Sequence, residues 1–169
     1  MKPAGEVKIL YDFTRSDTCP WFAIGDVVMG GVSHSAMRME NGRAVFTGVV
    51  SLDHGGGFAS VRSHPALWDL RDYTGIELTL QGDGRRYKLR LKTEPGFDGV
   101  NWETAFVTDA GARQKMCFPF RDLAPVYRGR LVSGAPPFDP GRIATFGLLI
   151  SDRQSGPFRL EVETVAAYQ

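Results

Sequence analysis

The chain has 169 residues, of which 43% are hydrophobic and 23% are charged, a composition that fits a globular domain with a core of its own. Twenty Lys and Arg residues against 19 Asp and Glu leave a formal net charge of +1, so no overall field draws the protein toward nucleic acid or an anionic membrane. The 20 glycines and 10 prolines exceed what helix interiors tolerate. We expect one domain over residues 1–169, rich in turns, with no nucleic-acid partner.

Targeting and membrane signals are missing from the sequence. Glu6 and Lys8 interrupt the apolar residues near the start, which argues against a signal peptide. No apolar run approaches the roughly 18 residues that a spanning helix needs. Cys19 and Cys117 lie far apart and lack C-x-x-C spacing, which predicts reduced thiols. These features predict a cytoplasmic location without membrane insertion.

The first predicted strand follows the turn signal Asn41-Gly42, with Val45, Thr47 and Val49 at alternate positions. Residues 65–70 begin with proline and are compatible with a single helical turn. That segment does not reach the length of a typical helix.

Two further strands are expected at Gly75–Gln81 and Arg86–Lys92, because apolar and polar residues alternate in both. Turn residues at positions 82–85 predict a hairpin in which Glu77 faces Arg90. Four basic residues of the second strand then share one face: Arg86, Lys88, Arg90 and Lys92. This basic stripe is either a groove for an anionic ligand or partner, or a solvated sheet face neutralised partly by Glu77. We favour the second interpretation.

The second half of the chain repeats the pattern. Alternating residues predict two strands, one with Trp102, Thr104 and Phe106 and one with Phe158, Leu160 and Val162. Thr145–Ile150 is apolar throughout, as in a strand covered on both faces, and residues 119–123 could form a second helical turn. The repeated short strands predict an all-β fold, an antiparallel β-sandwich or jelly roll.

The residues of known catalytic motifs are not found. His34, His54 and His64 lack the spacing and the Cys or His neighbours of a metal site, and the glycines at 55–57 lack the Lys-Ser/Thr of a phosphate loop. No nucleophile elbow occurs. We therefore expect no metal, no cofactor and no recognisable enzyme. Trp21 and Trp102 fit either core packing or a stacking platform for a sugar, and we assign Trp21 to the core.

Residues 21–33 (WFAIGDVVMGGVS) resemble the signature of the complex I intermediate-associated protein 30 family, a Trp followed by N-D-x-V-M-G-G-x-S. Gly25 stands where the family usually has Asn. Further matching pieces follow in family order from about Tyr11 to Val165, among them residues 46–52, 56–62, 82–84, 147–152 and 154–158. The resemblance implies a jelly roll of the galactose-binding-domain-like type.

Mitochondrial members of that family assist the assembly of respiratory complex I. The resemblance thus implies a non-catalytic assembly factor or protein-binding module with respiratory complex subunits as partners. A jelly roll that binds a carbohydrate or another small polar ligand is the alternative, and an acid–base cyclase or isomerase using Asp26 or Glu103 is a third.

Candidate ligand-binding residues come from the signature loop and from the predicted sheet: Asp26, Met29, Gly30, Gly31, Ser33, Arg62, Arg90, Trp102 and Gln154. The glycines of the loop permit close backbone approach to a ligand. The other interpretation is structural, with Asp26 capping a turn and the loop closing one end of the sandwich.

Overall fold

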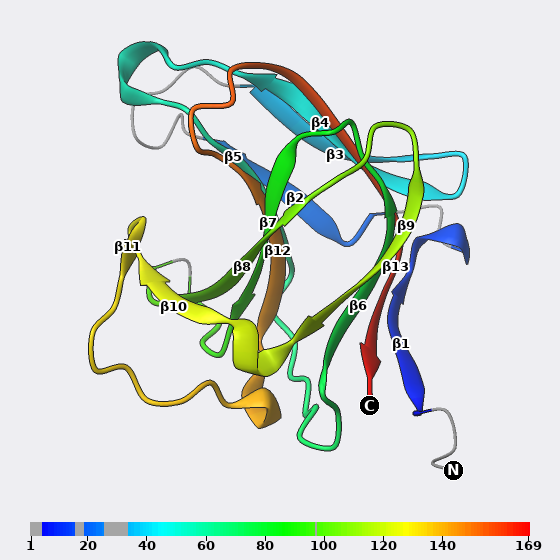
Figure 1. Cartoon of the computed structure of the whole chain (residues 1–169), viewed down its shortest axis with the longest axis vertical. Helices are drawn as coiled ribbons and strands as arrows, with labels where there is room; N and C mark the ends of the chain where they lie inside the picture. The colour runs from blue at the N-terminus through cyan, green and yellow to red at the C-terminus, as the bar shows by residue number, and fades with distance from the viewer. Residues whose placement is uncertain (1–4, 16–18, 26–33, 97) are drawn as a thin grey trace.

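Two antiparallel sheets pack face to face in the computed structural model (Figure 1). The structure describes residues 5–15, 19–25, 34–96 and 98–169. These residues contain strands and short 3-10 helices but no α-helix. The strands are β1 (Val7–Asp12), β2 (Trp21–Gly25), β3 (His34–Glu40), β4 (Arg43–Val50), β5 (Ala59–Ser63), β6 (Gly75–Gln81), β7 (Arg86–Lys92), β8 (Asn101–Val107), β9 (Arg113–Pro119), β10 (Ala124–Tyr127), β11 (Arg130–Leu131), β12 (Thr145–Ile150) and β13 (Gly156–Tyr168). The 3-10 helices are η1 (Phe13–Arg15), η3 (Asp53–Gly55), η4 (Phe120–Asp122) and η5 (Pro140–Arg142).

Each of the two sheets has its own strand order. The six-stranded sheet runs β3-β4-β13-β6-β9, with β1 paired to the C-terminal half of β13. The seven-stranded sheet runs β11-β10-β8-β7-β12-β5-β2. All six residues of β12, in the middle of that sheet, are buried, as predicted for an apolar strand without alternation. The expected antiparallel β-sandwich is confirmed.

The core lies between the sheets, where strands such as β5 and β7 bury alternate residues. In β7, Tyr87, Leu89 and Leu91 are fully buried, whereas Arg86, Lys88 and Arg90 are accessible from the outer face. Trp21 is 3% exposed, and its ring meets Tyr11 edge-on with the centroids 5.4 Å apart. The assignment of Trp21 to the core is confirmed.

The hairpin predicted from residues 75–92 is wrong in its pairing, although both strands have the predicted bounds. β6 pairs with β13 and β9, and β7 pairs with β12 and β8, so the chain changes sheets at residues 82–85. A period of two specifies which face of a strand is buried, but it does not specify the neighbouring strand. Glu77 therefore lies near Lys115 of β9 in its own sheet, with the carboxylate 3.9 Å from the ammonium, and does not face Arg90.

Asp83 holds this crossing between the sheets. Its carboxylate accepts hydrogen bonds from the backbone N–H of Arg85 at 3.1 Å, from the Tyr87 hydroxyl at 3.0 Å and from the backbone N–H of Arg159 at 2.8 Å. Burial raises the pKa of the Tyr87 hydroxyl, which keeps it protonated as a donor. Both sheets are thus tied to one carboxylate.

Of the predicted turns, the one at Asn41-Gly42 is confirmed, because both residues have positive φ (50° and 73°) and they join β3 to β4. The turn at residues 119–123 corresponds to η4. Residues 65–70 form no helix. They run extended beside Ile143, with hydrogen bonds between Trp68 and Ile143 in both directions, because pairing with another segment overrides the local preference of proline.

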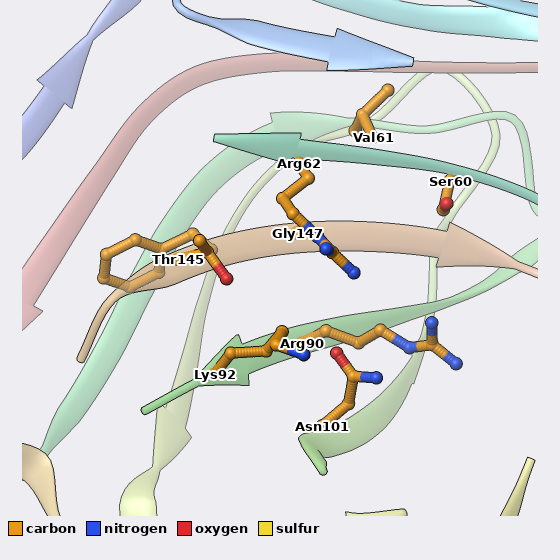
Figure 2. A pocket seen from close by; sticks show the side chains of 9 residues that line it. Ser60, Val61, Arg62, Arg90, Lys92, Asn101, Thr145 and Gly147 are labelled. Atoms are coloured by element: carbon orange, nitrogen blue, oxygen red, sulfur yellow. The ribbon is translucent and has the colours of Figure 1, made fainter. Parts of the chain in front are cut away.

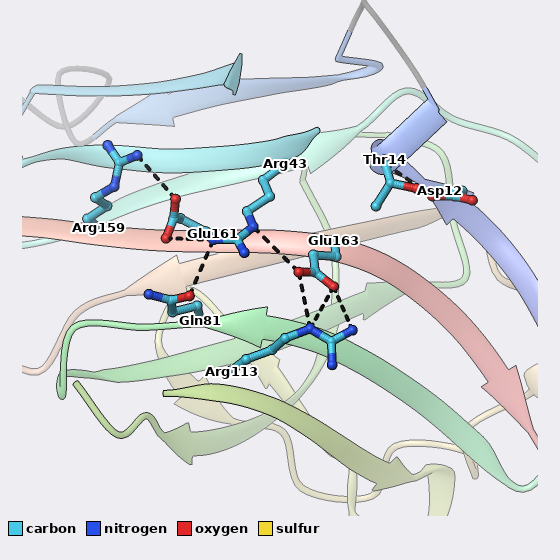
Figure 3. A network of polar contacts seen from close by, with 8 residues as sticks. All are labelled: Asp12, Thr14, Arg43, Gln81, Arg113, Arg159, Glu161 and Glu163. Atoms are coloured by element: carbon cyan, nitrogen blue, oxygen red, sulfur yellow. Dashed lines mark hydrogen bonds and ion pairs between the residues drawn. The ribbon is translucent and has the colours of Figure 1, made fainter. Parts of the chain in front are cut away.

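The outer face of the six-stranded sheet carries a network of charges, shown in Figure 3. Glu163 of β13 accepts hydrogen bonds from Arg113 of β9 at 2.9 Å and pairs with Arg43 of β4 at 3.4 Å. Arg159 donates to Glu161 at 3.2 Å. Arg43 thus links the neighbouring strands β4 and β13, and Arg113 reaches from β9 across β6 to β13, whereas the Arg159–Glu161 pair lies within β13.

Cys19 and Cys117 are free thiols, as predicted. A search of the described residues finds no helix with the length and apolar character needed to cross a membrane.

Candidate functional site

A groove of about 540 Å³ lies on the outer face of the seven-stranded sheet. Its walls come from β7, β8, β10 and β12 and from the loops that follow β10 and β12. The lining residues are Phe58, Lys88, Arg90, Asn101, Glu103, Val126, Arg128, Gly129, Leu149, Ser151 and Asp152. A groove of this kind on a rigid sheet is a suitable place for a binding site.

Strand register brings these side chains to one face. Arg90 lies opposite Glu103 on one side and opposite Gly147 on the other, and Lys88 lies opposite Leu149. The predicted basic stripe of β7 is therefore a real feature of the outer face. Its members point away from the core because the intervening residues of β7 are buried between the sheets.

Carboxylates of the neighbouring segments pair with this stripe. Glu103 accepts a hydrogen bond from Arg90 at 2.8 Å, and its other oxygen lies 3.7 Å from the Lys88 ammonium. Asp152 lies 3.5 Å from the Lys88 ammonium and 3.2 Å from Arg86. The stripe is thus partly neutralised, as predicted, but by Glu103 and Asp152 rather than by Glu77. Such half-buried pairs orient side chains more than they stabilise the fold.

A small pocket of about 10 Å³ adjoins the groove above β12 and shares Arg90 and Asn101 with it. Its lining comprises Ser60, Val61, Arg62, Arg90, Lys92, Asn101, Thr145, Phe146 and Gly147. Figure 2 shows the side chains of Arg62 from β5, of Arg90 and Lys92 from β7, and of Asn101 from β8 around Gly147. Gly147 lies opposite both Arg62 and Arg90, so no side chain separates the two arginines.

The cations of this pocket lie close to one another, and one of them is buried. Lys92 is only 1% exposed, and its ammonium donates a hydrogen bond to the backbone carbonyl of Asp98 at 3.0 Å. Burial lowers the pKa of Lys92, and the charge of Arg62 lowers it further. Burial also lowers the pKa of Arg62, with the charge of Arg90 as the second cause. Both pKa values are lowered for the same reason, which is that positive charges lie together in a place of low dielectric.

Asp98 connects Lys92 to the end of β10. Its carboxylate accepts hydrogen bonds from the Tyr127 hydroxyl at 3.1 Å and from Arg128 at 3.3 Å. The bond from Tyr127 is the largest cause of the lowered pKa of Asp98. The same residue therefore contacts Lys92 through its backbone and the rim of the groove through its side chain.

Among the predicted site residues, Arg62 and Arg90 come together beside Gly147, but Trp102 does not join them. Trp102 lies opposite Leu91, so it is on the inner face of the sheet, and its ring packs against Phe138 with the centroids 5.4 Å apart. Trp102 and Arg90 therefore lie on opposite faces of the sheet, because adjacent positions of a strand point to opposite faces. Of the two interpretations of Trp102, its contacts favour core packing.

Gln154 has a structural contact that the sequence did not suggest. Its side-chain oxygen accepts from the backbone N–H of Arg86 at 3.0 Å, and its amide donates to the carbonyl of Arg86 at 2.8 Å and to that of Ser151 at 2.9 Å. These bonds fix the loop that carries Asp152 into the groove. Gln154 thus positions the groove without lining it.

The signature-loop residues Asp26, Met29, Gly30, Gly31 and Ser33 lie outside the described residues, and their roles stay predictions. No group of three or more His, Cys, Asp and Glu side chains that could hold a metal occurs in the described ranges.

Sequence reasoning missed six residues that line the small pocket, namely Ser60, Val61, Asn101, Thr145, Phe146 and Gly147. The available signal was Gly147, since a glycine inside a strand often marks a close approach of another group.

The family model for Complex I intermediate-associated protein 30 matches residues 11–162. An uncharacterized protein of Schizosaccharomyces pombe is 30% identical over 166 residues, which cover 86% of this chain and 76% of that protein. Complex I intermediate-associated protein 30, mitochondrial, of Drosophila melanogaster is 25% identical, with 95% of this chain and 62% of that protein covered. The chain thus spans less than two thirds of this mitochondrial relative.

Solved structures share the fold at low sequence identity. A family 11 carbohydrate-binding module from Clostridium thermocellum, in complex with a beta-1,3-1,4-mixed-linked tetrasaccharide, has a TM-score of 0.74 at 14% identity, covering 98% of this chain and 96% of that chain. The agarase AgWH50C has a TM-score of 0.65 at 13% identity and covers 96% of this chain but 24% of the agarase. These similarities identify a galactose-binding-like jelly roll and say nothing of a ligand.

Proposed function

The chain belongs to the complex I intermediate-associated protein 30 family, and we propose on this basis that it is a non-catalytic protein-binding module that assists the assembly of respiratory complex I. The observation that carries the proposal is the family match over residues 11–162. The Drosophila relative bears the family role and a mitochondrial location in its name. Because the chain spans less than two thirds of that relative, the proposal concerns the part that they share.

The groove supports binding to another protein. Its lining combines apolar residues such as Val126 and Leu149 with charged residues that are already ordered by ion pairs. Ordered charges lose less side-chain entropy when a partner binds, and complementary charge sets the orientation of that partner. Glu103 has both oxygens close to cations, an arrangement better suited to holding a side chain in place than to transferring protons.

Carbohydrate binding is the second candidate, favoured by the fold shared with the family 11 module. Sugar rings are usually bound by stacking on aromatic side chains. Among the groove-lining residues of the described chain, Phe58 is aromatic, whereas Trp102 lies on the inner face. We prefer a protein partner for this reason.

Affinity purification from respiratory membranes of the host tests the proposal. Arg128 lies at the rim of the groove with its side chain 72% exposed, so Arg128→Glu reverses a charge there without burying it. Lys115→Glu makes the same change on the opposite sheet, where the side chain is 62% exposed, and serves as the matched control. We expect complex I subunits with the parent and with Lys115→Glu, and fewer with Arg128→Glu.

Repeated recovery of no respiratory subunit with the tagged parent contradicts the assembly role. Glycan binding by the same purified protein, at an affinity that Arg128→Glu weakens, would instead favour the carbohydrate alternative.

A further inference from the structure

We propose that the groove on the seven-stranded sheet recognises an acidic segment of a partner protein, with an aspartate or glutamate side chain bound by Arg90 and Asn101 and a second acidic side chain near Arg128. The proposal rests on the proposed function, because it names the chemistry of the protein segment that the groove would hold.

The carboxylates of the groove already have cations of the protein itself beside them. Glu103 accepts a hydrogen bond from Arg90 at 2.8 Å, and its other oxygen lies 3.7 Å from the Lys88 ammonium. One oxygen of Asp152 lies 3.5 Å from the same ammonium, and the other lies 3.2 Å from Nε of Arg86. A basic residue of a partner would have to share each of these oxygens with a cation, and like charges side by side disfavour that partner.

Arg90, in contrast, has unused hydrogen-bond donors. A guanidinium carries five N–H groups in a planar fork, and the bond to Glu103 uses the one at Nε. Within the part of the chain that the structure describes, the two terminal nitrogens of Arg90 make no hydrogen bond. The side chain is 22% exposed and lines the groove. A carboxylate that enters from solvent can therefore accept two parallel hydrogen bonds from this fork.

Asn101 adds an uncharged donor next to that fork. It lies on β8, two residues before Glu103, and it lines both the groove and the small pocket together with Arg90. Figure 2 shows its side-chain amide directed toward the side chain of Arg90. The amide makes no hydrogen bond to any other described residue. It is thus available to donate to the same carboxylate.

The balance of charge also favours an acidic partner. Lys88, Arg90 and Arg128 stand against two carboxylates among the residues that line the groove. Just outside the lining, Arg86 and Asp98 add one charge of each sign. Arg128 pairs with Asp98 at 3.3 Å, and both side chains are well exposed, at 72% and 68%. Such an exposed pair is weak, so a carboxylate of the partner can replace Asp98 beside Arg128.

The size of the groove favours a segment of protein over a free anion. Its volume of about 540 Å³ lies within the range of sites that enclose ligands larger than one side chain. The lining extends from Arg128 after β10, across β8 and β7, to Leu149 of β12. Three strand spacings make this width about 14 Å, which an extended segment of about four residues spans.

Selection from a display library of random short peptides tests the proposal, with the purified full chain immobilised at physiological ionic strength. We expect the enriched peptides to contain Asp and Glu well above their frequency in the library. An enriched acidic peptide, synthesised with a fluorescent label, then gives dissociation constants by anisotropy. Replacing its acidic residues by Asn and Gln should weaken binding by about tenfold or more, since hydrogen bonds to charged groups contribute at least that factor.

Charge variants of the groove give the sharper result, because the two signs predict opposite effects. Arg90→Gln should weaken binding of the acidic peptide by about tenfold or more, and Arg128→Gln by a smaller factor because its side chain is exposed. Asp152→Asn removes a negative charge and should tighten binding, and Asn suits the positive φ of 62° at this position. Lys115→Gln, on the opposite sheet, should leave the affinity within about twofold.

A melting curve for each variant separates loss of binding from loss of folding. Should Arg90→Gln fail to fold, Arg128→Gln and Asp152→Asn decide, because both of these side chains are more exposed than that of Arg90.

The proposal is overturned by enrichment of basic or uncharged peptides, by unchanged affinity in a folded Arg90→Gln variant, or by weaker binding to Asp152→Asn. It is also overturned if no peptide is enriched, and binding of a beta-1,3-1,4-mixed-linked tetrasaccharide in that case identifies the groove as a carbohydrate site. None of these measurements includes a complex I subunit, so their failure leaves the assembly role standing. Acidic peptides that bind as expected, without recovery of complex I subunits by affinity purification, support the chemistry of the groove and remove the assembly role.

Discussion

Asp83 offers the sharpest test of how family-matched residues act in this fold. It belongs to the Gly82-Asp83-Gly84 piece of the family resemblance, yet its carboxylate is used inside the protein, by Arg85, Tyr87 and Arg159. Asp83→Ala removes three hydrogen bonds at the crossing between the sheets and leaves the hydroxyl of the fully buried Tyr87 without this acceptor. At roughly 1 kcal/mol for each bond, we expect a loss of about 3 kcal/mol.

Denaturant unfolding followed by circular dichroism measures this loss, and for a chain of this length it corresponds to a melting point lower by about 6–12 °C. Tyr87→Phe should cost about 1 kcal/mol by itself. In the Asp83→Ala background the same change should lower the unfolding free energy by much less than that, because the hydrogen bond that the two residues share is already lost. A cost below about 0.5 kcal/mol for Asp83→Ala, or strict additivity of the two changes, would refute the structural role.

Three further predictions concern charge, core and thiol. The hydrogen bond from Arg113 holds the pKa of Glu163 below its ordinary value, so the stabilisation is present above that ordinary value and is lost as the pH falls through the lowered pKa. Glu163→Gln should therefore flatten the decline of unfolding free energy on acidification, and an unchanged slope contradicts this. Leu89→Ala should lower the unfolding free energy of the protein by about 2–5 kcal/mol. Leu67→Ala, at a side chain that is 79% exposed, should change it by less than about 0.5 kcal/mol. Equal effects of the two substitutions would contradict the position of Leu89 in the core. Burial raises the pKa of the Cys117 thiol, and the negative charge of Glu77 raises it further. Glu77→Gln should therefore speed the alkylation of Cys117 at mildly alkaline pH, as followed by mass spectrometry. A slower reaction would argue against that contact.

Much of the fold could be predicted because alternation is visible in the sequence. The bounds of β6 and β7 follow from it, and so does the outward position of the basic stripe, whereas β12 was predicted from an unbroken apolar run. Strand partners could not be predicted, since neighbours such as Arg90 and Glu103 depend on pairing between separate segments. The burial of Lys92 likewise depends on the loop at Asp98, which lies beside it only in the folded chain.

Trp102 shows how residue type can mislead. It alternates with Thr104 and Phe106, and Phe106 is buried, so its position already indicated the inner face of the sheet. A stacking platform was one of two interpretations because aromatic side chains often bind sugars, and the alternation of faces along the strand favours the other one, core packing. The signature-loop candidates and the cytoplasmic location stay predictions, and the mitochondrial names of relatives such as the Drosophila protein make location worth measuring.

Site-specific photo-crosslinking tests the central claim, that this chain binds respiratory complex I subunits through the groove. A photo-reactive phenylalanine analogue is placed at Arg128 on the groove rim or at Lys115 on the opposite sheet, both well exposed. Adducts with complex I subunits at position 128 and few at position 115 are the predicted result. Adducts confined to position 115, or none with complex I subunits at either position, would contradict the account.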